Sequence, residues 1–468
     1  MRFPFQRSAL RRKCAAVLLS VFASSVLHAA TLETTVDVPP LALREQTLPN
    51  GLQVVSVEDH ASPTVSIQVW YRVGSKDDPE HRSGFAHLFE HLMFKSTLNL
   101  ASEQFDRLTE DVGGMNNAFT SDDVTAYFEV VPANHLERLL WAEAERMSNL
   151  DVTQANFESE RAVVEEEFRS RVLAAPYGQF EYALQSQSFT THPYKRPTIG
   201  SIEDLENASL ADVQAFHRTY YRPDNATLIV VGDFSPAQLD TWVARYFGRI
   251  EWPAGDIPRV STVEPVRGAD RRVVVRAPNV PLPALGLTWL APPGNSADVP
   301  ALKVALAVLA GGEASRFYQA LVYRQQLAQD VGFYYSENAD AGVLVATAVL
   351  ANGKQPAEAE RALLAEIDHL RSAPIKLAEL QRAKTRLLTS ALASRETNEG
   401  KGIAIGSALT QTGAVAAVNT ELVQLQAVTA EDVQRVLKNY VIARHKVVVE
   451  YPGDASNTAQ ADAKGGAQ

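Results

Sequence analysis

Two stretches of this chain lie 220 residues apart and carry the same residues, and this repeat limits the fold more than any local signal. Asp212-Val213-Gln214 recurs as Asp432-Val433-Gln434, and Tyr220 recurs as Tyr440. In each copy the surrounding pattern predicts a helix that runs into a strand. We therefore expect two copies of one structural unit.

The beginnings of the two halves agree as well. Residues 52–58 and 64–73 alternate apolar and polar side chains, and residues 271–276 and 284–290 do so in the second half. A helical pattern follows each pair. About 440 residues are also too many for one ordinary core. We predict an α+β fold of two homologous domains, each a mainly antiparallel sheet packed with helices and related by internal duplication.

Changes in composition predict where these parts begin and end. Residues 1–30 carry a basic start, an apolar run and small residues, which is typical of a cleaved signal peptide. The first domain is placed at 41–250 and the second at 271–453. A linker rich in Pro and Gly is placed at 251–270. Residues 454–468 are small and polar and are expected to form a disordered tail.

Removal of residues 1–30 would change the character of the chain. It deletes the single cysteine, so the mature protein needs no disulfide. It also removes five positive charges, which takes the formal net charge from −11 to about −16. Such an acidic body argues against nucleic acid as a partner. No later apolar stretch predicts a membrane anchor, and we expect a bacterial protein that is periplasmic or secreted.

The residues that point to chemistry are His87, Glu90 and His91. On a helix the two histidines lie one turn apart, with Glu90 on the same side. Two imidazoles at this spacing can grip one metal ion, and a carboxylate that is not a ligand can hold a water. This is the His-x-x-Glu-His order of inverted zinc peptidases. The alternative is a chance pattern on an amphipathic helix.

A hydrolytic zinc site needs a third protein ligand, which we expect on an acidic helix at residues 156–172. Glu160, Val164 and Glu167 share one face of that helix. Acids on a half-buried face are costly unless they meet a cation or a donor. The alternative is a solvated, charged surface, and Glu165 and Glu166 are the other ligand candidates if the register differs.

Together these segments resemble the pitrilysin, insulinase and mitochondrial processing peptidase family, in its short form with two related domains per subunit. That family pairs its motif with a Glu about 76 residues later and another Glu seven residues earlier, positions that Glu167 and Glu160 match. The resemblance implies that His87, His91 and Glu167 bind one zinc ion per chain. It further implies that Glu90 activates the water, that Glu160 orients a ligand histidine, and that the chain forms half of a clam-like chamber.

A second matching stretch spans residues 113–121 and contains Asn117 and Ala118. It leads into residues 124–130, whose alternation is typical of an edge strand. The resemblance implies that this strand pairs with an extended peptide substrate, with Asn117 and Ala118 beside the scissile bond. The alternative is an ordinary hairpin strand. His192-Pro193-Tyr194 also resembles a family loop, and we expect it to be a structural turn.

The second half departs from the family pattern. Active members carry an Arg and, seven residues later, a Tyr that hold the substrate carbonyl, but Val322 and Gln329 stand at these positions. Arg316, Arg324 and Tyr334 lie nearby, and none is expected to replace the pair. We therefore predict a heterodimer with a homologous subunit that supplies the Arg/Tyr pair, or otherwise a homodimer.

Three functions are compatible with these sequence features. The first is a zinc-dependent endopeptidase that hydrolyses peptides or unfolded protein segments. The second is a non-catalytic scaffold subunit of the same fold, which the missing Arg/Tyr pair favours and the retained His87, Glu90, His91 and Glu167 oppose. The third is a metal-storage protein, in which Glu90 would have no role.

Overall fold

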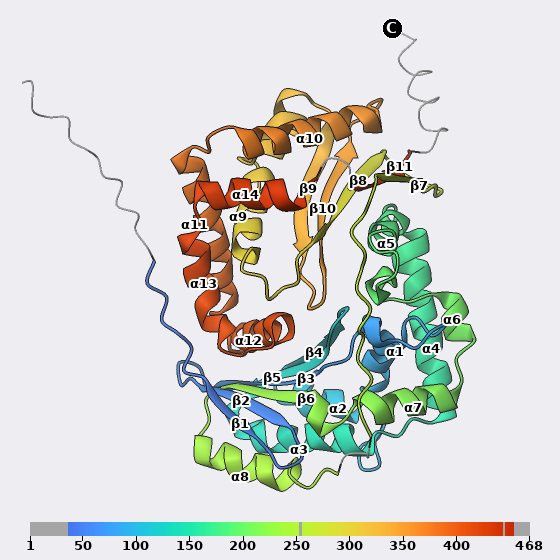
Figure 1. The fold of residues 1–468 in the computed structure, drawn as a ribbon. Helices are drawn as coiled ribbons and strands as arrows, with labels where there is room; N and C mark the ends of the chain where they lie inside the picture. The colour runs from blue at the N-terminus through green and yellow to red at the C-terminus, as the bar shows by residue number, and fades with distance from the viewer. Residues whose placement is uncertain (1–35, 252–254, 443–444, 454–468) are drawn as a thin grey trace, which may run out of the picture. The chain divides into compact units, whose positions relative to one another are not determined.

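A computed structural model describes residues 36–251, 255–442 and 445–453 (Figure 1). The predicted signal peptide and the predicted tail lie outside these residues. The residues between them form an α+β fold with two mixed sheets, as the sequence predicts. Within the described residues, no helix is both long and apolar enough to cross a bilayer.

The first sheet has six strands in the order β1-β2-β6-β3-β5-β4. Strands β2 and β6 run parallel, and the other neighbours are antiparallel. The strands are β1 Arg44–Thr47, β2 Gln53–Glu58, β3 Thr64–Tyr71, β4 Met115–Thr120, β5 Thr125–Pro132 and β6 Ala226–Gly232. The helices of this half are α1 Phe85–Leu92, α2 Gln104–Glu110, α3 Leu136–Asn149, α4 Gln154–Phe168, α5 Gly178–Ser186, α6 Ile202–Glu206, α7 Leu210–Tyr220 and α8 Pro236–Tyr246.

The second sheet has five strands in the order β7-β11-β8-β10-β9. They are β7 Arg271–Val274, β8 Ala284–Ala291, β9 Ala328–Ser336, β10 Gly342–Leu350 and β11 Val447–Tyr451. The helices are α9 Val299–Ala310, α10 Pro356–Ser372, α11 Leu377–Ser394, α12 Asn398–Thr412, α13 Ala417–Ala427 and α14 Ala430–Tyr440. Residues 255–270, between the halves, form neither helix nor strand. The predicted domain boundaries stay predictions.

The internal repeat extends from the strand order to local hydrogen bonds. Apart from β1, each strand of the first sheet has a counterpart in the second, in the same order and with one parallel pair, β7 and β11. Helices α7 and α14 begin with equivalent capping boxes, Ser209 with Asp212 and Thr429 with Asp432. Because these caps set where each helix begins, the repeated residues fix the same local structure twice.

Each half also contributes one helix that packs on the sheet of the other half. Helix α12 lies across the first sheet, where Gly406 touches Trp70 so closely that a Cβ at residue 406 would lie 2.2 Å from the indole ring (Figure 1). Helix α5 packs in return on the second sheet, with Phe180 and Leu184 in one apolar cluster with β11. The two helices begin 220 residues apart, so the exchange is part of the repeat.

One predicted strand position is wrong. The alternating residues 124–130 were expected at an edge, but β5 lies inside the sheet between β3 and β4. Its residues are almost all buried because both faces of the sheet are covered there. The edge is β4, which itself contains Asn117 and Ala118.

Candidate metal centre

Helix α1, which carries the two histidines, is held at its first turn by a side chain from outside the helix. Gly84 before it has φ +101°, and a Cβ there would lie 3.1 Å from the Cα of Gly200. The buried carboxylate of Asp78 accepts hydrogen bonds from the backbone N–H groups of Gly84 (2.7 Å) and Ala86 (2.8 Å). The position of His87, in the same turn, is thereby fixed.

Helix α4 presents its acids to α1. Its first turn is capped by Thr153, whose hydroxyl accepts a hydrogen bond from the N–H of Asn156. Phe157, Val164 and Glu160 are buried along one face. Glu167 continues that face one turn beyond Val164, and α4 packs on α1. The shared face that the sequence predicts is therefore present.

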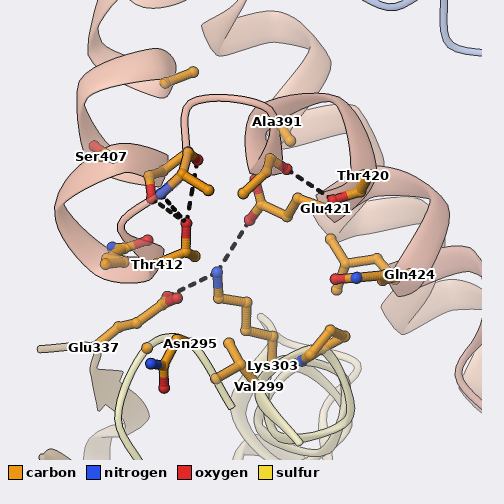
Figure 2. Close-up of a pocket in the computed structure, with 18 of the residues that line it drawn as sticks. Asn295, Val299, Lys303, Glu337, Ala391, Ser407, Thr412, Thr420, Glu421 and Gln424 are labelled. Carbon is orange, nitrogen blue, oxygen red and sulfur yellow. Dashed lines mark hydrogen bonds and ion pairs between the residues drawn. The ribbon is translucent and has the colours of Figure 1, made fainter. Parts of the chain in front are cut away.

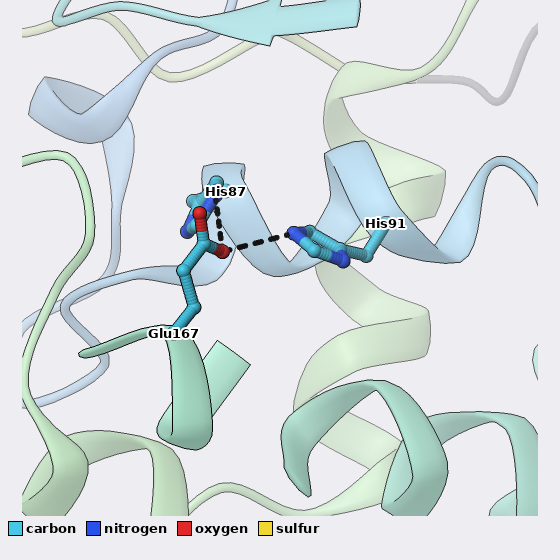
Figure 3. Close-up of side chains that lie close together, drawn as sticks. All are labelled: His87, His91 and Glu167. Atoms are coloured by element: carbon cyan, nitrogen blue, oxygen red, sulfur yellow. Dashed lines mark ion pairs between the residues drawn. The ribbon is translucent and has the colours of Figure 1, made fainter. Parts of the chain in front are cut away.

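The three predicted ligands lie together. Glu167 Oε2 is 3.5 Å from His87 Nε2 and 3.4 Å from His91 Nε2 (Figure 3). One atom from each of the three side chains lies within 4.8 Å of the other two. His87 is buried, whereas His91 and Glu167 are half-buried and reachable from solvent.

These side chains fit a zinc ion. Two ligands of a tetrahedral zinc lie about 3.3 Å apart when their bonds are about 2.0–2.1 Å long, close to the distances found here. Glu167 Oε2 is buried and, in the described structure, has no hydrogen-bond partner, which is costly unless a cation meets it. Two imidazole nitrogens and one carboxylate oxygen leave a fourth position open, as in hydrolytic zinc sites.

The pKa values of the two histidines are shifted in opposite directions. Burial, followed by the nearby His91, lowers the pKa of His87 to about 4, so its ring is neutral. Burial opposes the charged form of His91 too, but Glu160 and Glu167 outweigh it and raise the pKa of His91 to about 9. A metal ligand must be a neutral imidazole, so a bound cation takes the place of that proton.

Glu160 lies behind His91, as the resemblance implies. Its Oε2 is 3.6 Å from His91 Nδ1, and its Oε1 is 2.7 Å from Lys95 Nζ. Burial disfavours its charge, yet His91 and Lys95 outweigh burial and lower the pKa of Glu160. An ionised carboxylate beside Nδ1 is suited to orient a ligand histidine.

Glu90 lies on the same helix but outside the ligand cluster. Burial raises the pKa of its carboxyl, and a hydrogen bond from Thr120 partly offsets this effect. The Thr120 hydroxyl donates to Glu90 Oε2 at 2.6 Å. A carboxylate with a raised pKa beside a metal site is suited to take up and release a proton.

Asn117 and Ala118 lie on the edge strand β4, opposite Phe128 and Tyr127 of β5. The N–H of Ala118 donates to the side-chain oxygen of Asn117 (2.8 Å). Within the described residues, β4 has no strand on its other side. Its backbone can therefore accept an added strand.

Comparisons with known proteins identify the family of the chain. Residues 53–201 match the family model for "Insulinase (Peptidase family M16)", and residues 207–387 match "Peptidase M16 inactive domain". The chain is 33% identical over 343 residues to the zinc protease PqqE of Helicobacter pylori, covering 72% of this chain and 77% of the relative. The chain belongs to peptidase family M16.

Two further M16 similarities bear on fold and function. The crystal structure of a protease from Helicobacter pylori superposes with a TM-score of 0.85 at 28% identity, covering 88% of this chain and all of that one. The human mitochondrial cytochrome b-c1 complex subunit 1 is 27% identical over 262 residues, or 56% of this chain and 54% of the relative. The chain is therefore similar both to a named protease and to a named subunit of a complex.

The positions that depart from the M16 pattern lie in the second half. Val322 is half-buried in the π-helical turn η6 (Tyr318–Arg324), and Gln329 is exposed on β9. Arg316 is held by Glu379 through two hydrogen bonds of 2.7 and 2.9 Å, and Arg324 lies 3.5 Å from Glu366. Both arginines thus face acids of the second half, although Nη1 of Arg316 has no hydrogen-bond partner in the described structure and Arg324 is exposed.

Two other predictions concern residues outside the cluster. Of the other ligand candidates, Glu165 pairs with Arg169 and Glu166 is exposed. His192-Pro193-Tyr194 forms a buried turn in which the Tyr194 hydroxyl donates to Asp123 (2.6 Å). This contact supports a structural role for the turn.

Sequence reasoning missed three residues at the centre: Asp78, Thr120 and Arg171. Arg171 contacts the second oxygen of Glu167, Oε1. Its spacing of four residues from Glu167 on a helix was an available signal. Thr120 lies in the stretch 113–121, but nothing in the sequence pairs it with Glu90, because that contact joins a strand to a helix.

A hollow of about 780 Å³ in the second half shares no residue with the metal centre. It lies among α9, α11, α12 and α13, where Lys303 Nζ sits between Glu337 (2.7 Å) and Glu421 (3.0 Å) (Figure 2). Arg395 also contacts Glu421 (3.1 Å). Because these four charges neutralise one another, the hollow offers no charge that calls for a ligand.

Proposed function

We propose that this M16 family member is a zinc-dependent endopeptidase that hydrolyses peptides or unfolded protein segments. The observation that carries the proposal is that Glu167 Oε2 faces both His87 Nε2 and His91 Nε2, while Glu90 stands beside them without joining the cluster. A storage site needs ligands only, so the separate Glu90 supports a reaction at this site.

The roles follow from the donor set. His87, His91 and Glu167 would hold the zinc ion, and Glu160 would keep His91 oriented. Bound there, zinc supplies Lewis acidity, which polarises a peptide carbonyl and makes water easier to deprotonate. Glu90 takes the proton of the attacking water and passes it to the leaving amine.

Substrate binding is proposed at the open edge of β4. An extended peptide would add a strand there, with its scissile bond beside Asn117 and Ala118. Recognition through backbone hydrogen bonds requires an extended segment, so folded proteins would resist cleavage. The acidic balance of the chain supports peptides over nucleic acids as substrates.

The proposed activity also calls for a partner subunit. Val322 has no donor and Gln329 offers an uncharged amide in place of a phenol, so we propose that a homologous subunit supplies the Arg/Tyr pair, or else a second copy of the chain. Full peptidase activity of the purified chain, at a mass that shows no partner, would contradict the proposal. The basic and apolar residues 1–30 support export to the periplasm or the medium.

The decisive experiment changes Glu90 alone. Glu90→Gln should keep one zinc per chain and abolish peptide cleavage, because the amide cannot accept the proton. Glu166→Gln, an exposed acid on α4 that binds none of these groups, is the matched control and should keep both. Unchanged turnover in Glu90→Gln would refute the assignment.

The scaffold function is the second candidate, favoured by Val322 and Gln329 and by the similarity to a cytochrome b-c1 subunit. A scaffold should bind no stoichiometric zinc and should not cleave peptides in any assembly. A storage protein should bind zinc and cleave nothing. Zinc content and chelator-sensitive cleavage, measured on the same preparation, separate the three functions.

A further inference from the structure

The carboxylate of Glu90 depends on one neighbour for its orientation. In the described part of the chain, the Thr120 hydroxyl is the one hydrogen-bond donor that contacts it, at 2.6 Å from Oε2. Glu90 is half-buried, and its side chain has three rotatable bonds. Without the hydroxyl, several rotamers would be open to it. The bond leaves Oε1 available for a proton.

Thr120 owes its place to the tight turn between β4 and β5. It is the last residue of β4 and pairs with Thr125, the first residue of β5. The Ser121 N–H donates to the carbonyl oxygen of Val124 (2.8 Å), and the Ser121 hydroxyl accepts from the N–H of Val124 (3.1 Å). The turn therefore determines where the Thr120 hydroxyl points.

Two acids in this turn are bound by the second half of the chain. Asp122 Oδ2 accepts a hydrogen bond from the side-chain amide of Asn338 (2.8 Å). Asp123 Oδ2 accepts one from the backbone N–H of Ala339 (2.8 Å). Residues 337–341 connect β9 to β10, and we call them the hairpin tip. The hairpin tip of the second half thus holds the turn that follows Thr120.

Residues of the first half also form hydrogen bonds with the two acids of this turn. Asp122 Oδ1 also accepts from Ser75 Oγ and from Gln185 Nε2, both at 2.9 Å. The Tyr194 hydroxyl donates to Asp123 and accepts from the N–H of Asp340 (3.1 Å). A turn with this many partners is rigid, and rigidity is what a catalytic carboxylate needs from its support.

We infer that Thr120 is a positioning residue for Glu90, and that the hairpin tip sustains this position through Asp122 and Asp123. The inference rests on the proposed function of Glu90 as the proton acceptor. It gives a part in the reaction to the second half, whose described residues hold no metal-ligand cluster. The part is mechanical, because no atom of the tip needs to touch substrate.

The first test replaces the hydroxyl. Thr120→Val keeps the shape and removes the donor, and should lower kcat about 10- to 100-fold with KM and zinc content unchanged. Thr120→Ser retains the hydroxyl and should recover most of kcat. In a Glu90→Gln background, Thr120→Val should change neither the residual rate nor the zinc content, because no proton acceptor remains to be positioned.

The second test removes the hydrogen bond from Asn338 of the hairpin tip to Asp122. Asn338→Ala should lower kcat about three- to tenfold, again with zinc content unchanged, and should add little to Thr120→Val. Asn352→Ala, an exposed residue beyond the other end of β10, is the matched control and should leave kcat intact. Circular dichroism verifies that each variant is folded.

The outcomes distinguish this inference from the proposed function. If Glu90→Gln is inactive while Thr120→Val has normal kcat, the positioning role is wrong and the proposed function stands. If Glu90→Gln turns over normally, the proposed function itself fails. If Thr120→Val loses zinc, or if Thr120→Ser is as slow as Thr120→Val, the residue supports the fold and the inference is overturned. Additive losses from Asn338→Ala and Thr120→Val would disprove the role of the tip.

Discussion

Arg171 and Glu167 share a contact that divides the two oxygens of the carboxylate. The guanidinium of Arg171 contacts Oε1, and Oε2 faces the two histidines. Arg171 lies in the π-helical turn η3 (Arg169–Ala174), which continues directly from α4. Such turns occur often at functional sites, and here the turn brings a cation beside a metal ligand. Glu167 therefore offers one oxygen to the centre.

Loss of that cation should weaken metal binding. In Arg171→Gln the carboxylate can rotate, so we expect zinc affinity to fall about tenfold, at the lower end of such effects. Chelator competition measures it. Arg169→Gln, in the same turn but paired with Glu165 and Glu166, is the control and should bind zinc normally. Equal affinities in the two variants would show that Arg171 has no such role.

Removal of a ligand should have a larger effect than removal of its neighbour. His91→Ala and Glu167→Ala should each lose zinc almost completely on purification, because two protein ligands do not retain it at a hydrolytic site. Elemental analysis of the purified variants is the measurement. Glu166→Ala should keep the metal, since this side chain points to solvent. Stoichiometric zinc in Glu167→Ala would remove that residue from the ligand set.

The packing of α12 on the first sheet predicts a sharp contrast between two glycines. Gly406→Ala places a methyl group 2.2 Å from the ring of Trp70 and should lower the free energy of unfolding by about 1–3 kcal/mol. Gly268→Ala, at a position where an added Cβ meets no atom within 4 Å, should cost little. Urea unfolding of both variants provides the comparison, and equal stabilities would contradict the packing.

Glu264 should make folding depend on pH. Partial burial disfavours its charge, but the N–H groups of residues 190–192 and the Thr190 hydroxyl outweigh it and lower the pKa of Glu264 to about 2. Because this pKa lies below the ordinary 4.5, the stabilisation is complete above pH 4.5 and is lost as the pH falls toward 2.

Glu264→Gln should therefore be less stable than the parent chain at pH 7, and the difference should shrink at pH 3.5. Because the group is only partly buried, we expect about 1 kcal/mol at pH 7. Urea unfolding at the two pH values measures the difference. Glu313→Gln, an exposed acid, should show no such trend. A difference that grows in acid would reverse the assigned sign.

The sequence predicts the fold where the signals are local or repeated. The repeat around Asp212 and Asp432 predicts two equivalent units because the capping residues recur with the strands they precede. The face shared by Glu160, Val164 and Glu167 follows from helical spacing alone. The meeting of Glu167 with the histidines came from a resemblance, because the spacing within one helix does not reveal its partner helix.

What the sequence could not predict depends on contacts between distant segments. The alternation of residues 124–130 is the same in an edge strand and in an inner strand, since it reports the faces of a sheet and not its neighbours. The contact of Thr120 with Glu90 joins residues 30 apart on different elements. The exchange of α5 and α12 leaves no sign in either helix, because an apolar face does not specify which sheet it covers.

That exchange makes each half a cofolding partner of the other. A chain cut within residues 255–270 would yield two fragments, each with a sheet face stripped of its borrowed helix and exposed to water. Such fragments should precipitate alone and regain solubility when mixed. In the intact chain, the segment that joins the halves keeps them at a high effective concentration relative to each other. The second half is therefore needed to keep the first half soluble, although its described residues hold no metal-ligand cluster.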